Sequence, residues 1–210
     1  HGFGDKVLPY EEGSKSPLII HDPRQPKNHA GAVCRAVTGN VDIAATIFAL
    51  AGVTAPDGID GKNLLPLLAA PDSQVREALP LFNFWGAHSA QSMAVVTPDW
   101  KYIHWYYGKG MQPAEELFNV SQDAYEMANL AAESAYGAAL ETMRKHYDAE
   151  LAAIRDKVIH GHGYEAYPVL FDRRKSWAEK EPLVESLKPR KGTEIEGEAK
   201  ARKSKKKSAP

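Results

Sequence analysis

Cysteine is almost absent from this chain. Cys34 is the single cysteine among 210 residues, which excludes an intrachain disulfide and gives no further indication of the redox compartment. No apolar run approaches the roughly 20 residues that a transmembrane helix needs, so no membrane partner is expected. The formal net charge is −1 at pH 7, so the whole chain has no charge-based preference for nucleic acid or an acidic membrane.

The chain also lacks an initiator methionine and a signal peptide, and it opens inside a motif. We therefore expect it to be the C-terminal piece of a longer protein, whose location a missing signal does not reveal. Apolar residues make up 43% of the chain and charged residues 25%. These fractions are ordinary for a globular protein with a core of its own.

The first twenty residues, HGFGDKVLPYEEGSKSPLII, place one lysine between a glycine-punctuated loop and an acidic turn. Residues 18–20 are apolar and predict a short buried strand after a turn that uses Gly13. A lysine on a loop ahead of a core strand suits an anion site, because its ammonium group is a compact charge with three donors. The other interpretation of Lys6 is an ordinary solvated surface lysine.

Residues 41–52 predict a short helix, with Asp42 as N-cap and Gly52 as the stop. Its apolar stripe is formed by Ile43, Ile47 and Leu50. A small apolar patch follows at residues 64–68, and residues 71–78 are interpreted as a linker.

The pattern then changes from mixed α/β to β. Short apolar or aromatic runs joined by tight turns predict an antiparallel meander of four strands, at residues 79–85, 92–97, 100–107 and 115–119. The aromatic run 100–107 indicates either core packing or a sugar-stacking surface. An amphipathic helix with its apolar stripe from Tyr136 to Val158 is expected to cover this sheet.

From residue 173 onward the hydrophobic content falls, which predicts a disordered basic tail over residues 173–210. Such a tail can attract a polyanion or act only as a solubilising segment. His160 and His162 could ligate zinc, but no further ligand follows at a recognised spacing, so we interpret them as part of a glycine-rich helix end.

Three stretches resemble the type I sulfatases, the formylglycine-dependent enzymes of the alkaline-phosphatase-like superfamily. They are the pattern H-G-x-x-x-K-x-x-x-Y-E-x-G-x-x-x-P-L-I-I of residues 1–20, the run VDIAATIFALAGVTAPDGIDGKNLLPLL, and ELFNVSQDAYEMANLA at residues 116–131. The last departs from the family by carrying Ala124 and Tyr125 where the family has proline and a variable residue. The resemblance covers residues 1–131 and extends by position to about residue 160.

In that family the lysine matching Lys6 contacts the sulfate and assists the leaving oxygen, so Lys6 is the expected catalytic and substrate-binding residue. His88, beside Trp85, falls where the family's C-terminal subdomain reaches the pocket rim; it either binds a sugar or faces water. The resemblance also implies a formylglycine made from a C/S-x-P-x-R motif, and a Ca²⁺ ion held by Asp and Asn or His. Cys34 lies in AVCRAV and does not match that motif, so the formylglycine and the calcium ligands are expected upstream of His1.

The resemblance implies an α/β fold: the C-terminal portion of an alkaline-phosphatase-like sulfatase, then a small α+β subdomain. We expect residues 1–78 to end the catalytic domain, residues 79–172 to form the sheet-and-helix subdomain, and residues 173–210 to form the tail.

The implied function is hydrolysis of a sulfated carbohydrate or aryl sulfate by the full-length protein, with the fragment alone inactive. The partner is then the sulfate ester rather than a specific nucleic acid, and the location is periplasmic or secreted. The alternatives are a phosphodiesterase or phosphonate monoester hydrolase of the same superfamily, and a non-catalytic polyanion-binding module.

Overall fold

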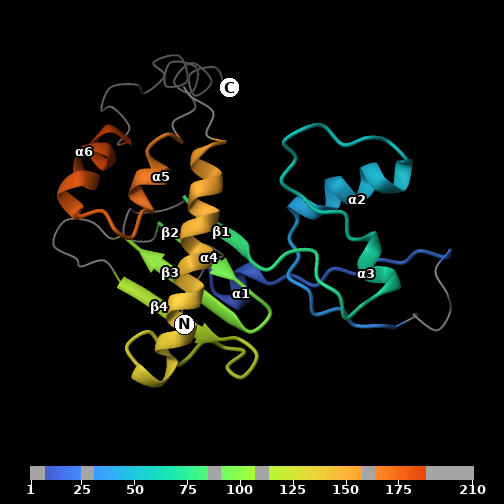
Figure 1. The fold of residues 1–210 in the computed structure, drawn as a ribbon, viewed down its shortest axis with the longest axis horizontal. Helices are drawn as coiled ribbons and strands as arrows, with labels where there is room; N and C mark the ends of the chain where they lie inside the picture. Colours follow the sequence, from blue (N-terminus) through green and yellow to red (C-terminus); the bar gives the residue numbers. More distant parts are fainter. Residues whose placement is uncertain (1–7, 25–30, 85–90, 107–113, 158–163, 188–210) are drawn as a thin grey trace, which may run out of the picture.

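The computed structural model describes residues 8–24, 31–84, 91–106, 114–157 and 164–187 (Figure 1). A four-stranded sheet with helices forms one part, and α2 and α3 lie to one side of it (Figure 1). The elements are α1 (Glu11–Ser14), α2 (Val41–Ala51), α3 (Leu65–Ala69), β1 (Leu79–Asn83), β2 (Ser92–Val96), β3 (Trp100–Trp105), β4 (Ala114–Asn119), the 3₁₀ turn η3 (Ser134–Tyr136), α4 (Gly137–Arg155), α5 (Tyr167–Leu170) and α6 (Trp177–Leu187). No helix within the described ranges is long and apolar enough to cross a bilayer.

The sheet is an antiparallel meander in the order β1-β2-β3-β4, as the sequence predicts. Its register pairs Val95 with Tyr102 and Tyr102 with Leu117. The turn between β2 and β3 is closed by Thr97, whose backbone N–H donates to the Trp100 carbonyl at 2.8 Å. Its hydroxyl accepts from the Trp100 N–H at 3.1 Å, so residues 97–100 form a tight hairpin turn.

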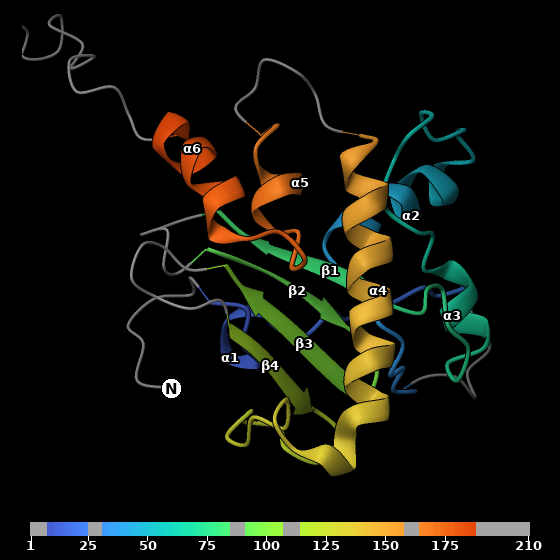
Figure 2. The same ribbon diagram turned by 60° about the vertical axis from the view of Figure 1, so that its left-hand side comes forward.

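Helix α4 covers one face of the sheet (Figure 2), which confirms the predicted amphipathic helix. Its buried residues recur at intervals of three or four, and they are Leu140, Met143, Tyr147 and Leu151. They pack on the inward side chains of the strands, among them Met93, Val95, Tyr102 and Leu117. Each such buried side chain contributes roughly 1.5–3 kcal/mol, so this layer is the main core of the protein.

The opposite face of the sheet carries a second, smaller apolar cluster of Ala94, Ile103, Trp105 and Phe118. It is covered by Leu8 and Tyr10, which lead into α1 behind the sheet (Figure 2). Trp105 and Tyr106 therefore point to opposite faces and both are buried. The core interpretation of the aromatic run holds for the described residues, and Tyr107 lies outside them.

Helix α2 has its polar face inward and its apolar face outward. Asp42 and Thr46 are buried, whereas the predicted stripe is exposed, Ile47 by 58%. Asp42 is also not the N-cap, which is Asn40. The sequence pattern predicts the helix and its end at Gly52, which has φ 65°. It does not predict which face of the helix packs against the rest of the described residues.

Asp42 joins α2 to two distant segments of the chain. Its carboxylate accepts from the backbone N–H groups of Gly39 at 2.8 Å and Lys62 at 2.7 Å, and it forms an ion pair with Arg76. Burial works to raise the pKa of Asp42, but the Arg76 guanidinium and these two N–H groups hold it below its usual range. Residues 71–78 are therefore more than a linker, because Arg76 fastens them to α2.

The strand predicted at residues 18–20 is wrong. The segment forms no strand, and Leu18 and Ile19 are 48% and 90% exposed. A strand needs a neighbour for its backbone hydrogen bonds, and the described sheet consists of β1 to β4 alone.

The tail predicted from residue 173 is wrong over residues 177–187, which form α6. Val184 is buried, and Trp177, Leu183 and Leu187 pack against the main core. The helix start has a local signal in the sequence: Ser176 and Glu179 match the capping-box spacing, and the Ser176 N–H donates to the Glu179 carboxylate at 2.9 Å. Residues 188–210 lie outside the described ranges.

Candidate functional site

Both predicted site residues, Lys6 and His88, lie outside the described residues, as do His1 and Trp85. The described chain begins at Leu8, two residues after Lys6. The site is therefore built from the segment that follows Lys6, residues 8–15, and from what holds that segment in place.

Tyr10 fixes this segment to β4. Its hydroxyl lies 3.0 and 3.2 Å from the two carboxylate oxygens of Glu116. The same carboxylate accepts from the Trp105 indole N–H at 2.9 Å. The Tyr10 ring meets Phe118 edge-on, with 6.0 Å between ring centroids. One carboxylate of the sheet thus binds both the sheet's own tryptophan and a residue 106 positions earlier in the chain.

Lys101, in β3, lies between two glutamates: Glu11 of α1 and Glu126 of the loop after β4. Its ammonium nitrogen is 2.7 Å from Glu11 Oε1 and 2.9 Å from Glu126 Oε1. The side chains of Lys101 and Glu126 are fully buried, and that of Glu11 is 12% exposed. The other oxygen of Glu126, Oε2, accepts from the Glu11 backbone N–H at 2.5 Å. We call Lys101, Glu11 and Glu126 the buried triad.

The pKa values of the two carboxylates of the triad are shifted in opposite directions. Burial raises the pKa of Glu126 above its usual range, despite the Lys101 ammonium nearby. Burial also acts to raise the pKa of Glu11, but Lys101 and Lys15 together outweigh it and the pKa of Glu11 is lowered. Glu126 also has a left-handed backbone, with φ 52°, which non-glycine residues adopt rarely. Lys101 is thus the one cation that both carboxylates share, and Glu11 has Lys15 as a second, exposed partner.

On the other face of the sheet, two basic groups are buried without such partners. Burial and the nearby Lys180 lower the pKa of His104 to about 3. Burial lowers the pKa of Lys180 to about 8, and its ammonium lies 5.9 Å from the Tyr106 ring centroid. Within the described chain, neither ring nitrogen of His104 nor the Lys180 ammonium has a hydrogen-bond partner. Neutral His104 is therefore a core residue against Tyr147.

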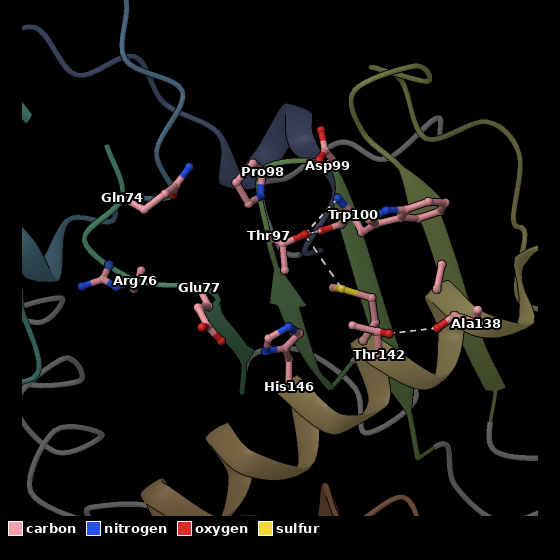
Figure 3. Close-up of a pocket in the computed structure, with 12 residues that line it drawn as sticks. Gln74, Arg76, Glu77, Thr97, Pro98, Asp99, Trp100, Ala138, Thr142 and His146 are labelled. Carbon is pink, nitrogen blue, oxygen red and sulfur yellow. Dashed lines mark hydrogen bonds between the residues drawn. The ribbon is translucent and has the colours of Figure 1, made fainter. Parts of the chain in front are cut away.

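A cavity of about 580 Å³ lies between the segment before β1, the β2–β3 turn and α4. Trp100 and Gln74 lie at opposite sides of it, with Thr97 between them (Figure 3). Its charged lining includes the acidic residues Glu77 and Asp99. The one arginine in the lining, Arg76, is already bound to Asp42. Two carboxylates, together with an arginine that is already paired with Asp42, make this lining unfavourable for a sulfate ester.

The described residues do not fit a calcium site. They contain no group of three or more His, Cys, Asp or Glu side chains placed to hold a metal ion. Cys34 is exposed and forms no disulfide.

The comparison with protein-family models decides the family. Residues 1–156 match the model described as N-sulphoglucosamine sulphohydrolase, C-terminal. The chain belongs to this family. It is a C-terminal part of a sulfatase of the alkaline-phosphatase-like superfamily, as its motifs predict. Helices α5 and α6 lie beyond the matched residues of this sulfatase chain.

Sulfatases are also found among its relatives. An N-acetylglucosamine-6-O-sulfatase of Bacteroides thetaiotaomicron is 32% identical over 142 residues, covering 65% of this chain and 25% of that protein. Arylsulfatase K of Xenopus laevis is 32% identical over 134 residues, 60% of this chain and 24% of that protein. A solved structure in complex with its substrate D-glucosamine-2-N,6-O-disulfate has a TM-score of 0.58 and 27% identity, covering 67% of this chain and 28% of the other. The chain thus spans about a quarter of the length of the curated relatives it matches.

The buried triad was missed by the sequence analysis, although two of its members lie in sulfatase-like motifs. Glu11 belongs to the Y-E-x-G pattern and Glu126 to the E-x-x-N-L-A pattern. A usable signal was the position of Lys101, which alternation places on the same face of β3 as Ile103 and Trp105. A lysine on an apolar strand face needs a buried acidic partner.

Proposed function

We propose that the full-length protein containing this chain hydrolyses sulfate esters, and that Lys6 contacts the sulfate and assists the leaving oxygen. The observation that carries the proposal is the anchoring of the segment directly after Lys6. Tyr10 and Glu11 are held by buried ionic and hydrogen-bonded contacts to the sheet, as a segment presenting a charged group to a reacting atom requires.

The role of Lys6 follows from the charge that develops in the reaction. As the S–O bond breaks, negative charge grows on the leaving oxygen. A positioned ammonium group therefore stabilises the transition state more than it stabilises the bound substrate. A formylglycine nucleophile and a Ca²⁺ ion that neutralises the sulfate oxygens belong to the same proposal. We assign both to the part of a sulfatase that this chain does not span, because Cys34 lies outside a C/S-x-P-x-R motif and the described residues contain no group of three or more His, Cys, Asp or Glu side chains placed to hold a metal ion.

For the substrate we propose a sulfated carbohydrate. A relative named as an N-acetylglucosamine-6-O-sulfatase, and a similar structure in complex with a disulfated glucosamine, support this class. His88 is proposed to bind the sugar at the pocket rim. We propose a periplasmic or secreted location for the full-length protein, as for most bacterial sulfatases that the chain resembles.

We further propose that residues 1–78 belong to the catalytic α/β domain. The outward stripe of α2, formed by Ile43, Ile47 and Leu50, supports this because exposed apolar side chains in a row mark a surface that another part of the protein covers. The exposed residues 18–19 fit the same arrangement.

The test is a comparison of turnover in the full-length enzyme, using 4-nitrophenyl sulfate and D-glucosamine-2-N,6-O-disulfate. Lys6→Ala should lower kcat by roughly 10²-fold or more, as for the loss of a donor to a developing negative charge. The matched control is Lys145→Ala, which removes an exposed lysine of α4 and should leave kcat unchanged.

An unchanged kcat in Lys6→Ala would show that the motif assignment is wrong. The 210-residue chain alone should release no sulfate with or without added Ca²⁺, and calcium-dependent release would contradict the placement of the nucleophile outside it. Faster turnover of a phosphonate monoester than of either sulfate would favour phosphoryl chemistry instead.

A further inference from the structure

The buried triad joins three parts of the chain that are far apart in sequence. Glu11 is in α1 just after Lys6, Lys101 is in β3, and Glu126 lies in the turn after β4. Glu11 and Glu126 are separated by 115 positions, yet the N–H of Glu11 donates to the Glu126 carboxylate at 2.5 Å. Both the side chain and the backbone of Glu11 are therefore held.

The triad holds residues of α1 on the sheet and lies outside the main core. Alternation along β3 directs Lys101 to the face opposite α4, where α1 lies behind the sheet (Figure 2). The contacts of Leu8 and Tyr10 with the second apolar cluster continue along the same face. Together they hold residues 8–11, the described residues next to Lys6 in sequence, by a buried cation, a shared carboxylate and an apolar contact.

Helix α1 and the residue before it are held by several kinds of contact: the ion pair of Glu11 with Lys101, the bond from the Glu11 N–H to Glu126, and the Tyr10 hydroxyl on Glu116. Residues in α1 contribute no buried side chain to the main core, so a hydrophobic contact alone would leave α1 free to shift on the sheet. Ionic and hydrogen-bonded contacts are directional, and they fix orientation as well as distance. Burying two carboxylates around one lysine is a costly way to attach a surface turn, which indicates that its orientation matters.

We propose that Lys101 and Glu126, assisted by Glu116 through Tyr10, are positioning residues for the sulfate-contacting lysine. They hold residues 8–14, the segment that follows Lys6 in the sequence, in one orientation on the sheet. The inference rests on the proposed function of Lys6. It assigns to the C-terminal sheet a part in catalysis without any contact to substrate.

The test uses a double-mutant cycle in the full-length enzyme with 4-nitrophenyl sulfate. Glu126→Gln keeps the shape of the side chain and removes its charge, and it should lower kcat by about tenfold or more, since small misplacements of a catalytic group are costly. KM should change far less than kcat, because the variant weakens an interaction that is made in the transition state rather than the binding of the substrate. In the Lys6→Ala background the same change should lower kcat by less than about twofold, because the residue acts only through Lys6.

A milder variant and a matched control complete the design. Tyr10→Phe removes the hydroxyl that reaches Glu116 and should lower kcat with the same dependence on Lys6. Glu133→Gln, at an exposed glutamate in the loop before α4, should change nothing. Hydrogen exchange at residues 8–15 should speed up in Glu126→Gln and Tyr10→Phe and stay unchanged in the control.

Each result decides between two failures. If Lys6→Ala itself leaves kcat unchanged, the proposed function of Lys6 is wrong. If Lys6→Ala lowers kcat while Glu126→Gln and Tyr10→Phe do not, the positioning role is wrong and the proposed function stands. If their effects on kcat multiply with that of Lys6→Ala, the triad serves general stability and the inference is likewise overturned.

Discussion

Removal of the triad's cation should be among the most destabilising single substitutions in this protein. Lys101→Met keeps the apolar stem but leaves the carboxylates at 2.7 and 2.9 Å without their shared cation. Breaking a buried ion pair costs about 3–5 kcal/mol. Glu11 keeps a second cation, Lys15 at 2.9 Å, which is 72% exposed, so we expect the lower end, a loss of about 3 kcal/mol in the free energy of unfolding at pH 7.

The same variant should be less destabilised in mild acid. Burial already raises the pKa of Glu126 above its usual range, and removal of the Lys101 ammonium, which acts to lower it, should raise that pKa further. The folded variant then binds protons that the unfolded chain does not, so its relative stability rises as the pH falls from 7 toward 4.5. Urea unfolding at pH 7 and pH 5 measures this, and Lys101→Met/Glu126→Gln should be more stable than Lys101→Met at pH 7. A loss below 1 kcal/mol at pH 7, or one independent of pH, would refute this reasoning.

Two further predictions concern the rest of the fold. Gly61→Ala should destabilise the protein by about 1–3 kcal/mol in thermal unfolding, because the new Cβ would lie 2.0 Å from the Val41 carbonyl oxygen. Gly137→Ala is the control and should not destabilise the protein, because nothing lies within 4 Å of its Cβ position. Equal stabilities of the two variants would contradict the close approach at Gly61. His104, with a pKa of about 3, should keep the NMR shifts of a neutral imidazole from pH 8 to pH 5. A titration near its usual value of 6.5 would show instead that the ring is solvated. Because the unfolded chain binds a proton at this histidine at higher pH than the folded protein does, His104 lowers the free energy of unfolding as the pH falls below 6.5.

The sheet and its covering helix could be predicted from the sequence because their signals are local. Strand runs are separated by turn residues such as Pro98-Asp99, and the stripe from Leu140 to Leu151 repeats every three or four residues. Each pattern reports which residues are inward without reference to distant parts of the chain. The first three strands end one or two residues earlier than predicted, and β4 begins one residue earlier, which is the usual uncertainty of ends.

Predictions failed where the outcome depends on a distant partner. The apolar run at residues 18–20 looks like a strand, but a strand is defined by its neighbour. The stripe of α2 looks inward, but Asp42 turns the helix by binding Arg76, 34 positions away. Composition pointed to a tail at residue 173, yet Trp177 and Val184 supply enough apolar area to dock α6.

The candidate site was predictable only as a list of residues. The motifs name Lys6, Glu11 and Glu126, but no spacing rule says that the two glutamates meet at Lys101. That contact spans 90 positions on one side and 25 on the other, and it depends on the register of β3 with β4. Register is a property of the whole sheet.

At Glu126 the backbone conformation and the side-chain contacts favour different residue types. At φ 52° a glycine or asparagine fits with less strain than a glutamate. Only an acidic side chain, however, can form the ion pair with Lys101 through one oxygen while the other oxygen accepts from the Glu11 N–H. Substituting glycine at Glu126 would relax the turn and still weaken the protein, so a consensus-style choice of the best turn residue would here be a design error. In redesigning this sheet, the turn after β4 must be chosen for charge before conformation.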